Sequence, residues 1–107
     1  MLQRSVTDRV FQAVSDPTRR SILEFLTEGP LSAGEIADRL PVSLTAVGQH
    51  LRILEEADLV RTTKSGRVRT CELRTEGLRP VADWVEKRRT TWTRPVEPRI
   101  SHDFGED

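Results

Sequence analysis

The stretch LSAGEIADRLPVSLTAVGQHLRILEEADLV, residues 31–60, decides the fold because it contains two helix starts only a few residues apart. Ser32 and Glu35 have the spacing of a capping box, in which the two side chains satisfy each other's backbone donors at a helix N-terminus. Ser43 is placed to cap a longer helix over residues 43–57. Two short helices joined by a tight turn predict a helix-turn-helix.

The residues before this stretch predict two further helices. Apolar residues recur at helical spacing over residues 3–14, which indicates one buried face of a short helix. The next helix has Ser15 or Asp16 as its N-cap. Pro17 then occupies the favoured first helical position, and Gly29 ends the helix.

The pattern changes from helical to extended after the longer helix. Residues 59–73 read LVRTTKSGRVRTCEL, two runs rich in Val and Thr around a glycine-containing turn, which predicts a β-hairpin. Thr75 is expected to cap a last helix that runs to about Trp92. Residues 94–107 are proline-containing and acidic, and we expect a loosely ordered tail there. We therefore predict one folded domain over residues 1–93.

Composition limits the class of protein without naming a partner. A chain of 107 residues suits one domain, and a domain this small is often stabilised by oligomerisation. The chain has 17 basic and 17 acidic residues and a net charge of zero, so only the distribution of charge can indicate a partner. The single cysteine permits no intrachain disulfide, and no signal sequence or membrane span is visible. We expect a cytoplasmic protein.

The helix predicted over residues 43–57 has two faces when successive residues are placed about 100° apart. The side expected to be buried carries Leu44, Val47, Leu51 and Leu54. The opposite side carries Thr45, Gln49 and Arg52 and, less neatly, Ala46 and Ile53. In the DNA major groove glutamine can pair with adenine, arginine with guanine, and threonine with a base or a thymine methyl. An ordinary solvated polar face is the alternative for this helix taken alone.

A basic hairpin favours DNA as the partner of that face. Residues 61–69, RTTKSGRVR, contain four cations and no acid, and such a hairpin can lie along the phosphate backbone. Basic hairpin tips also serve solubility and protect sheet edges, which is the alternative. His50 can contact a phosphate or pack on the flank of its helix. The predicted DNA-contacting residues are Ser43, Thr45, Ala46, Gln49, His50, Arg52, Lys64, Arg67 and Arg69.

Three segments together closely resemble the ArsR family of winged helix-turn-helix transcriptional repressors over about residues 6–92. These segments are DPTRRSIL at 16–23, HLRILEEADLV at 50–60 and SGR at 65–67. The resemblance implies a mainly α fold with a small β-hairpin wing, ordered as four helices, the hairpin and a last helix. It also implies a homodimer, joined through the first and last helices, that binds an inverted repeat in double-stranded DNA. The segment ADWVEKRRTTW, 82–92, looks like the subgroup that binds no metal.

The resemblance also implies which residues form the dimer interface. They are Val6, Val10, Phe11, Val81, Trp84, Val85, Arg88 and Trp92. Burial of these residues within their own chain is the alternative. Two positions depart from the family pattern: Gly48 stands where serine is common, and Asp58 replaces a common glycine at a helix end. Because a serine hydroxyl can reach a phosphate, we expect Gly48→Ser to tighten DNA binding. The alternative is that glycine leaves a gap for close approach to the DNA, in which case serine should weaken binding.

No catalytic or metal-binding pattern is visible, so we expect neither enzymatic activity nor a cofactor. One cysteine and two widely separated histidines do not supply the roughly four ligands of a zinc site. Cys71 is interpreted as an apolar filler on a strand, with a redox switch as the alternative. We predict a sequence-specific DNA-binding repressor. The alternative is a winged-helix protein–protein interaction module that uses Ala46, Ile53 and the tryptophans.

Overall fold

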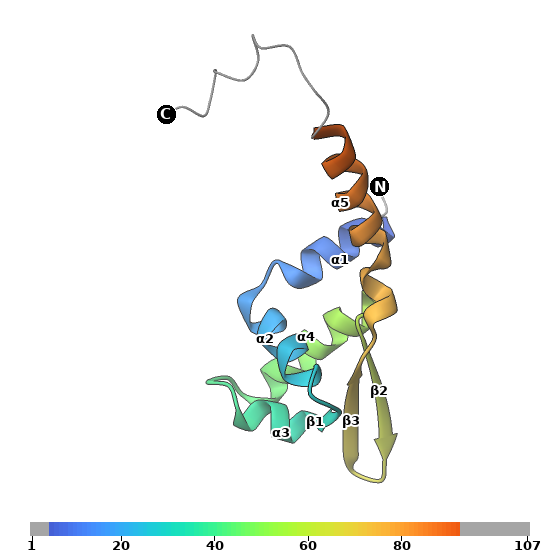
Figure 1. The fold of residues 1–107 in the computed structure, drawn as a ribbon. Helices are drawn as coiled ribbons and strands as arrows, with labels where there is room; N and C mark the ends of the chain where they lie inside the picture. The colour runs from blue at the N-terminus through green and yellow to red at the C-terminus, as the bar shows by residue number, and fades with distance from the viewer. Residues whose placement is uncertain (1–4, 93–107) are drawn as a thin grey trace.

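The computed structural model describes residues 5–92, which form a winged helix-turn-helix as the sequence predicts (Figure 1). The helices are α1 (Val6–Val14), α2 (Pro17–Leu26), α3 (Ala33–Asp38), α4 (Leu44–Glu56) and α5 (Arg79–Trp92). The strands are β1 (Leu31–Ser32), β2 (Val60–Ser65) and β3 (Val68–Leu73), and a 3₁₀ helix, η1 (Thr75–Leu78), precedes α5. The predicted tail, residues 94–107, lies outside the described residues.

The caps predicted from the sequence are present. In the capping box of α3 the Glu35 amide donates to Ser32 Oγ at 3.0 Å, and the Ser32 amide donates to Glu35 Oε1 at 2.8 Å. Ser43 caps α4 by accepting a hydrogen bond from the Ala46 amide at 3.1 Å. Asp16 is the residue that caps α2. Since these caps satisfy backbone donors that a helix start leaves free, they set where the two helices of the motif begin.

The described residues form a three-stranded antiparallel sheet with the order β1-β3-β2. The β2–β3 hairpin is the predicted wing, whereas β1 was not predicted because two residues are too few to show a strand period. Leu31 of β1 lies opposite Cys71 of β3. The predicted cap at Thr75 is wrong, because Thr75 begins η1 and the last α-helix starts only at Arg79.

The core is formed where α1, α2, α3 and α4 meet the sheet. Its fully buried large side chains are Ile22, Ile36, Leu51, Leu54, Leu59, Val10, Val47 and Cys71. The predicted buried face of α4 is confirmed for Val47, Leu51 and Leu54 and is wrong for Leu44, which is 57% exposed. Leu44 is the first residue of α4 and precedes Val47, the first buried residue of that helix, by about one turn.

The turn that leads from α4 into the wing depends on Asp58 and on Gly77, which packs against it. Asp58 has a φ of +62°, a left-handed conformation that aspartate tolerates and that often follows a helix end. Gly77 of η1 is buried against this turn. A Cβ added at Gly77 would lie 2.1 Å from the backbone oxygen of Asp58. The glycine is therefore required for η1 to cross the turn at this distance.

We expect Gly77→Ala to destabilise the fold by about 1–3 kcal/mol, because the new methyl group forces two backbone segments apart. Gly48→Ala is the matched control, since no described heavy atom lies within 4 Å of a Cβ at that position. It should stabilise α4 by up to about 1 kcal/mol, the helix penalty of glycine. Urea denaturation of both variants measures the two effects, and equal stability of the Gly77→Ala variant and the wild type would contradict this account.

Candidate nucleic-acid interface

The outward face of α4 carries the polar side chains predicted to read DNA. Thr45, Gln49 and Arg52 are all exposed. Arg52 Nε lies 3.6 Å from Glu56 Oε2 one turn later, and both side chains are largely exposed. A surface ion pair of this kind contributes about 0–1 kcal/mol, so the guanidinium can exchange it for a base edge at little cost. The face therefore offers a hydroxyl, an amide and a guanidinium.

The wing is fastened to α4 by a polar contact that the sequence pattern does not reveal. Arg69 Nη2 donates to Glu55 Oε1 at 3.0 Å, and both side chains are about one-third exposed. Thr62 of β2 donates its hydroxyl to the other oxygen of Glu55. The Arg69 guanidinium is thus paired within the protein, whereas Lys64 and Arg67 at the tip are exposed. The contact could not be predicted because Glu55 and Arg69 are brought together only by the hairpin.

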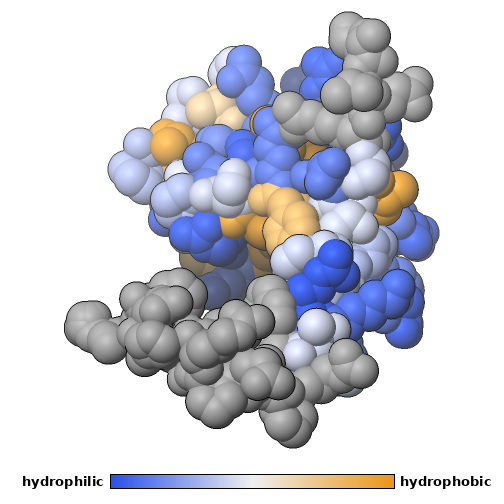
Figure 2. All heavy atoms as spheres, turned by 90° about the horizontal axis from the view of Figure 1, so that it is seen from above, coloured by the Kyte–Doolittle hydropathy of each residue, from blue (hydrophilic) through white to orange (hydrophobic). Residues whose placement is uncertain are grey.

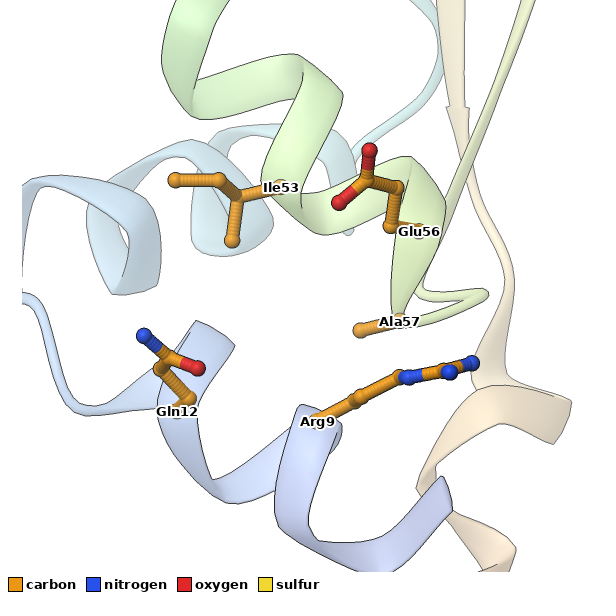
Figure 3. A pocket seen from close by; sticks show the side chains of 5 residues that line it. All are labelled: Arg9, Gln12, Ile53, Glu56 and Ala57. Atoms are coloured by element: carbon orange, nitrogen blue, oxygen red, sulfur yellow. The ribbon is translucent and has the colours of Figure 1, made fainter. Parts of the chain in front are cut away.

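Ala46 and Ile53 are half-buried on the flank of α4. Ile53 packs against the core, and its predicted place on the outward face is wrong. It lines a pocket of about 320 Å³ between α4 and α1. Figure 3 shows Arg9 and Gln12 of α1 facing Ile53, Glu56 and Ala57 of α4 across this pocket. Ile53 therefore does not contribute an apolar contact to a protein partner on the reading face.

A buried arginine connects the first helix to α4. Arg19 is only 9% exposed, and its Nε donates to the Ala13 carbonyl at 2.7 Å and its Nη2 to the Gln12 carbonyl at 3.2 Å. These bonds cap the C-terminus of α1, where a cation is favourable. Arg19 Nη1 also lies 3.2 Å from His50 Nδ1. The half-buried His50 of α4 is thus engaged by Arg19 on one ring nitrogen.

Arg19 was not predicted, although a signal was present in the sequence. It lies three residues before the buried Ile22 and so falls on the inward face of α2. An arginine on an inward face must find hydrogen-bond acceptors, and the C-terminus of the preceding helix supplies them. The backbone amide of Arg19 also donates to Asp16, which is the main reason why the pKa of that carboxyl is lowered.

Cys71 lies in the middle strand and is fully buried. Burial is the largest effect on its thiol and raises its pKa, while Arg69 lowers it and Glu55 raises it further. A thiol with a raised pKa is a poor nucleophile at neutral pH, which favours the apolar-filler interpretation over the redox switch. Within residues 5–92, no group of three His, Cys, Asp or Glu side chains is arranged to hold a metal ion.

A second exposed surface lies where α1 runs beside the base of α5, which projects from the body opposite the wing (Figure 1). Phe11 and Trp84 meet edge to face with ring centroids 5.5 Å apart, and Arg88 lies 4.5 Å over the Trp84 ring. Val6, Phe11, Trp84 and Val85 are 57%, 37%, 37% and 41% exposed, and we call these four residues the α1–α5 patch. Figure 2, seen from the α5 end, shows apolar side chains among hydrophilic ones on this face.

Some residues predicted for the dimer interface lie elsewhere. Val10 is fully buried in its own chain, so its assignment to an outward interface is wrong. Val81 is half-buried and packs against the core. The backbone of Trp92 ends α5, but its side chain lies outside what the structure describes. In the described part of the chain, no helix is both long enough and apolar enough to cross a membrane.

Comparison with known proteins gives the same fold and one class of function. A family model described as a helix-turn-helix domain matches residues 14–63. The HTH-type transcriptional regulator Rv2034 of Mycobacterium tuberculosis is 44% identical over 89 residues, covering 83% of this chain and 80% of the relative. The transcriptional repressor SdpR of Bacillus subtilis is 36% identical over 78 residues, covering 73% of this chain and 87% of the relative.

A solved structure agrees along the full length of its chain. The crystal structure of an ArsR family transcriptional regulator has a TM-score of 0.80 and 35% identity, covering 89% of this chain and 100% of its own. The fold and the exposed face of α4 define a winged helix-turn-helix DNA-binding regulator of transcription. The chain belongs to the ArsR family. None of these relatives supports the alternative of a protein–protein interaction module.

We expect Arg19→Met to destabilise the protein by about 2–3 kcal/mol, because it leaves the buried carbonyl of Ala13 without its charged donor. Arg20→Met is the matched control, since Arg20 is exposed and its donor bond to the Val14 carbonyl, 2.6 Å long, is also exposed. The control should cost less than about 1 kcal/mol. Thermal and urea unfolding of the two variants test the difference, and equal losses would show that burial of Arg19 is unimportant.

Proposed function

We propose that the protein is a homodimeric repressor that binds an inverted-repeat operator, with α4 in the major groove and the wing on the phosphate backbone. One observation carries this proposal: the first turns of α4 and the exposed cations of the wing border a single crevice. Leu44 and Gly48 line it from α4, and Lys64 and Arg67 line it from the wing. A base-reading helix and a phosphate-binding hairpin placed around one hollow suit a DNA strand.

The proposed contacts divide into base reading and backbone positioning. Thr45, Gln49 and Arg52 are exposed and have the donors and acceptors that pair with base edges. Lys64 and Arg67 would neutralise phosphates. The remaining predicted contacts have smaller parts: Ser43 already caps α4, Ala46 and His50 are half-buried, and Arg69 is paired with Glu55. A regulator that works in this way acts where the DNA is, which we propose to be the cytoplasm.

Selection of bound sequences from a random DNA library tests the proposal directly. We expect enrichment of an inverted repeat and an affinity that falls steeply as salt rises. Gln49→Ala and Arg52→Ala should each lose about 1–3 kcal/mol of discrimination at one base position per half-site. Lys64→Ala should weaken binding to all sequences alike and lower the salt slope by about 1 for each wing. Binding that is equal for every sequence would contradict the proposed function.

The α1–α5 patch is the proposed dimer interface. The described side chains of α5 are exposed or half-buried, and a helix of 14 residues is marginal in water without tertiary packing. The patch presents a tryptophan and a phenylalanine, and aromatic residues are enriched in protein interfaces. A two-fold dimer would present two copies of α4 to half-sites about one DNA turn apart, or a multiple of it.

We expect Trp84→Ala to raise the dimer dissociation constant by at least about 30-fold, because a central aromatic contributes about 2 kcal/mol or more to such an interface. Sedimentation velocity over a range of concentrations measures the change. Val68→Ala is the control, because Val68 is a 52% exposed apolar residue at the start of β3, in the wing, and it is not part of the α1–α5 patch. A wild type that stays monomeric at high concentration, or a Trp84→Ala variant that dimerises equally well, would overturn the interface.

A further inference from the structure

The hollow between α4 and the wing has features that base reading by Gln49 and Arg52 does not explain. It has a volume of about 440 Å³, and we call it the wing crevice. The lining side chains that matter here are Leu44, Lys64, Arg67, Val68 and Arg69, with Gly48 at the α4 side. Two large apolar side chains therefore face a hollow that is rimmed by cations.

The exposure of Leu44 and Val68 is unusual for a fold whose other apolar residues on these elements pack inward. Leu44 is 57% exposed and Val68 is 52% exposed, while Val47, the next large apolar residue of α4, is fully buried. Scattered surface apolar residues need no explanation, but these two border the same crevice. Leu44 is also the first residue of α4, and helices of this kind enter the major groove by their N-terminal residues.

The charges around the crevice select a polyanionic occupant. Lys64 and Arg67 are exposed, whereas the Arg69 guanidinium is paired with Glu55 and stabilises the wall. The described side chains that line the hollow are apolar, hydroxyl-bearing or cationic. One DNA strand matches this pattern, because its phosphates complement the cations and its sugars and thymine methyl groups complement the apolar side chains.

We propose that Leu44 is a specificity-determining residue that packs against a thymine methyl group, in a strand whose phosphates are held by Lys64 and Arg67. This inference rests on the proposed function and adds to it a base preference that hydrogen bonds do not provide. A leucine side chain cannot form the hydrogen bonds that a polar base edge makes with water. Contact with Leu44 therefore disfavours a base whose major-groove edge is wholly polar. The thymine methyl is the apolar group that the major groove presents.

Gly48 keeps the α4 side of the wing crevice open. A Cβ at Gly48 would meet no described heavy atom within 4 Å, so no neighbour in the chain requires glycine there. Close packing against other described residues therefore does not explain this glycine. What a side chain at this position would meet is the strand in the crevice, and a short hydroxyl would reach it beside the Leu44 contact.

The test uses the operator selected by the wild-type protein and exchanges each thymine of one half-site for uracil. This exchange removes only the methyl group, and at the position read by Leu44 it should weaken wild-type binding about fourfold. The Leu44→Ala variant should bind the thymine and uracil operators equally at that position. Leu78→Ala is the control, because Leu78 is 41% exposed but lies outside the crevice, and it should keep the full thymine preference.

The outcomes separate this inference from the proposed function. If no operator is selected, the proposed function itself fails. If the wild type selects an operator but every uracil exchange is neutral, or if Leu44→Ala keeps the same thymine preference, the inference fails and the repressor remains. Because Leu44 is exposed, the variant should keep the wild-type melting temperature. If Leu44→Ala instead lowers the affinity for the thymine operator and for the uracil operator by the same factor, the thymine preference is kept. Leu44 would then act on the position of the helix, and the methyl contact would be overturned.

Discussion

The buried guanidinium of Arg19 is the constraint on which the arrangement of the helices depends. A charge that is only 9% exposed is costly unless it is hydrogen-bonded, and the Arg19 guanidinium contacts two carbonyls of α1 and one nitrogen of His50. These bonds need the C-terminus of α1, the start of α2 and the middle of α4 to meet at one point. The helix proposed to dimerise and the helix proposed to read DNA are therefore held together directly.

Glu55 holds the other flank of α4. Its two carboxylate oxygens accept from Thr62 on β2 and from Arg69 on β3, so both strands of the wing are tied to the helix. Together with the Arg19–His50 contact, this places polar anchors on both sides of α4 and leaves Thr45, Gln49 and Arg52 outward. A reading face fixed in this way needs little ordering on binding, which lowers the entropic cost of association. The half-buried anchors contribute to DNA affinity by fixing the shape of this face.

The features that could be predicted from sequence are those that depend on neighbouring residues. The capping box of Ser32, the cap at Ser43 and the glycine turn of the wing are local, and each is present. The errors share a different cause. The burial of Val10 and the exposure of Leu44 depend on where the core ends, and this cannot be predicted from helical spacing. Likewise, the pairing of Arg69 with Glu55 joins residues fourteen positions apart, which only the hairpin brings together.

An apolar contact can matter in a protein that binds DNA when part of its positive charge is paired within the fold. The chain is neutral overall, and Arg19 and Arg69 are committed within the fold. The exposed Lys64 and Arg67 of the wing can still attract phosphates, but this attraction is the same for every sequence. Because phosphate contacts carry no sequence information, a contact that senses a single methyl group contributes directly to selection among sequences. The exposed Leu44 at the start of α4 is therefore consistent with a regulator that gains discrimination from fit more than from charge.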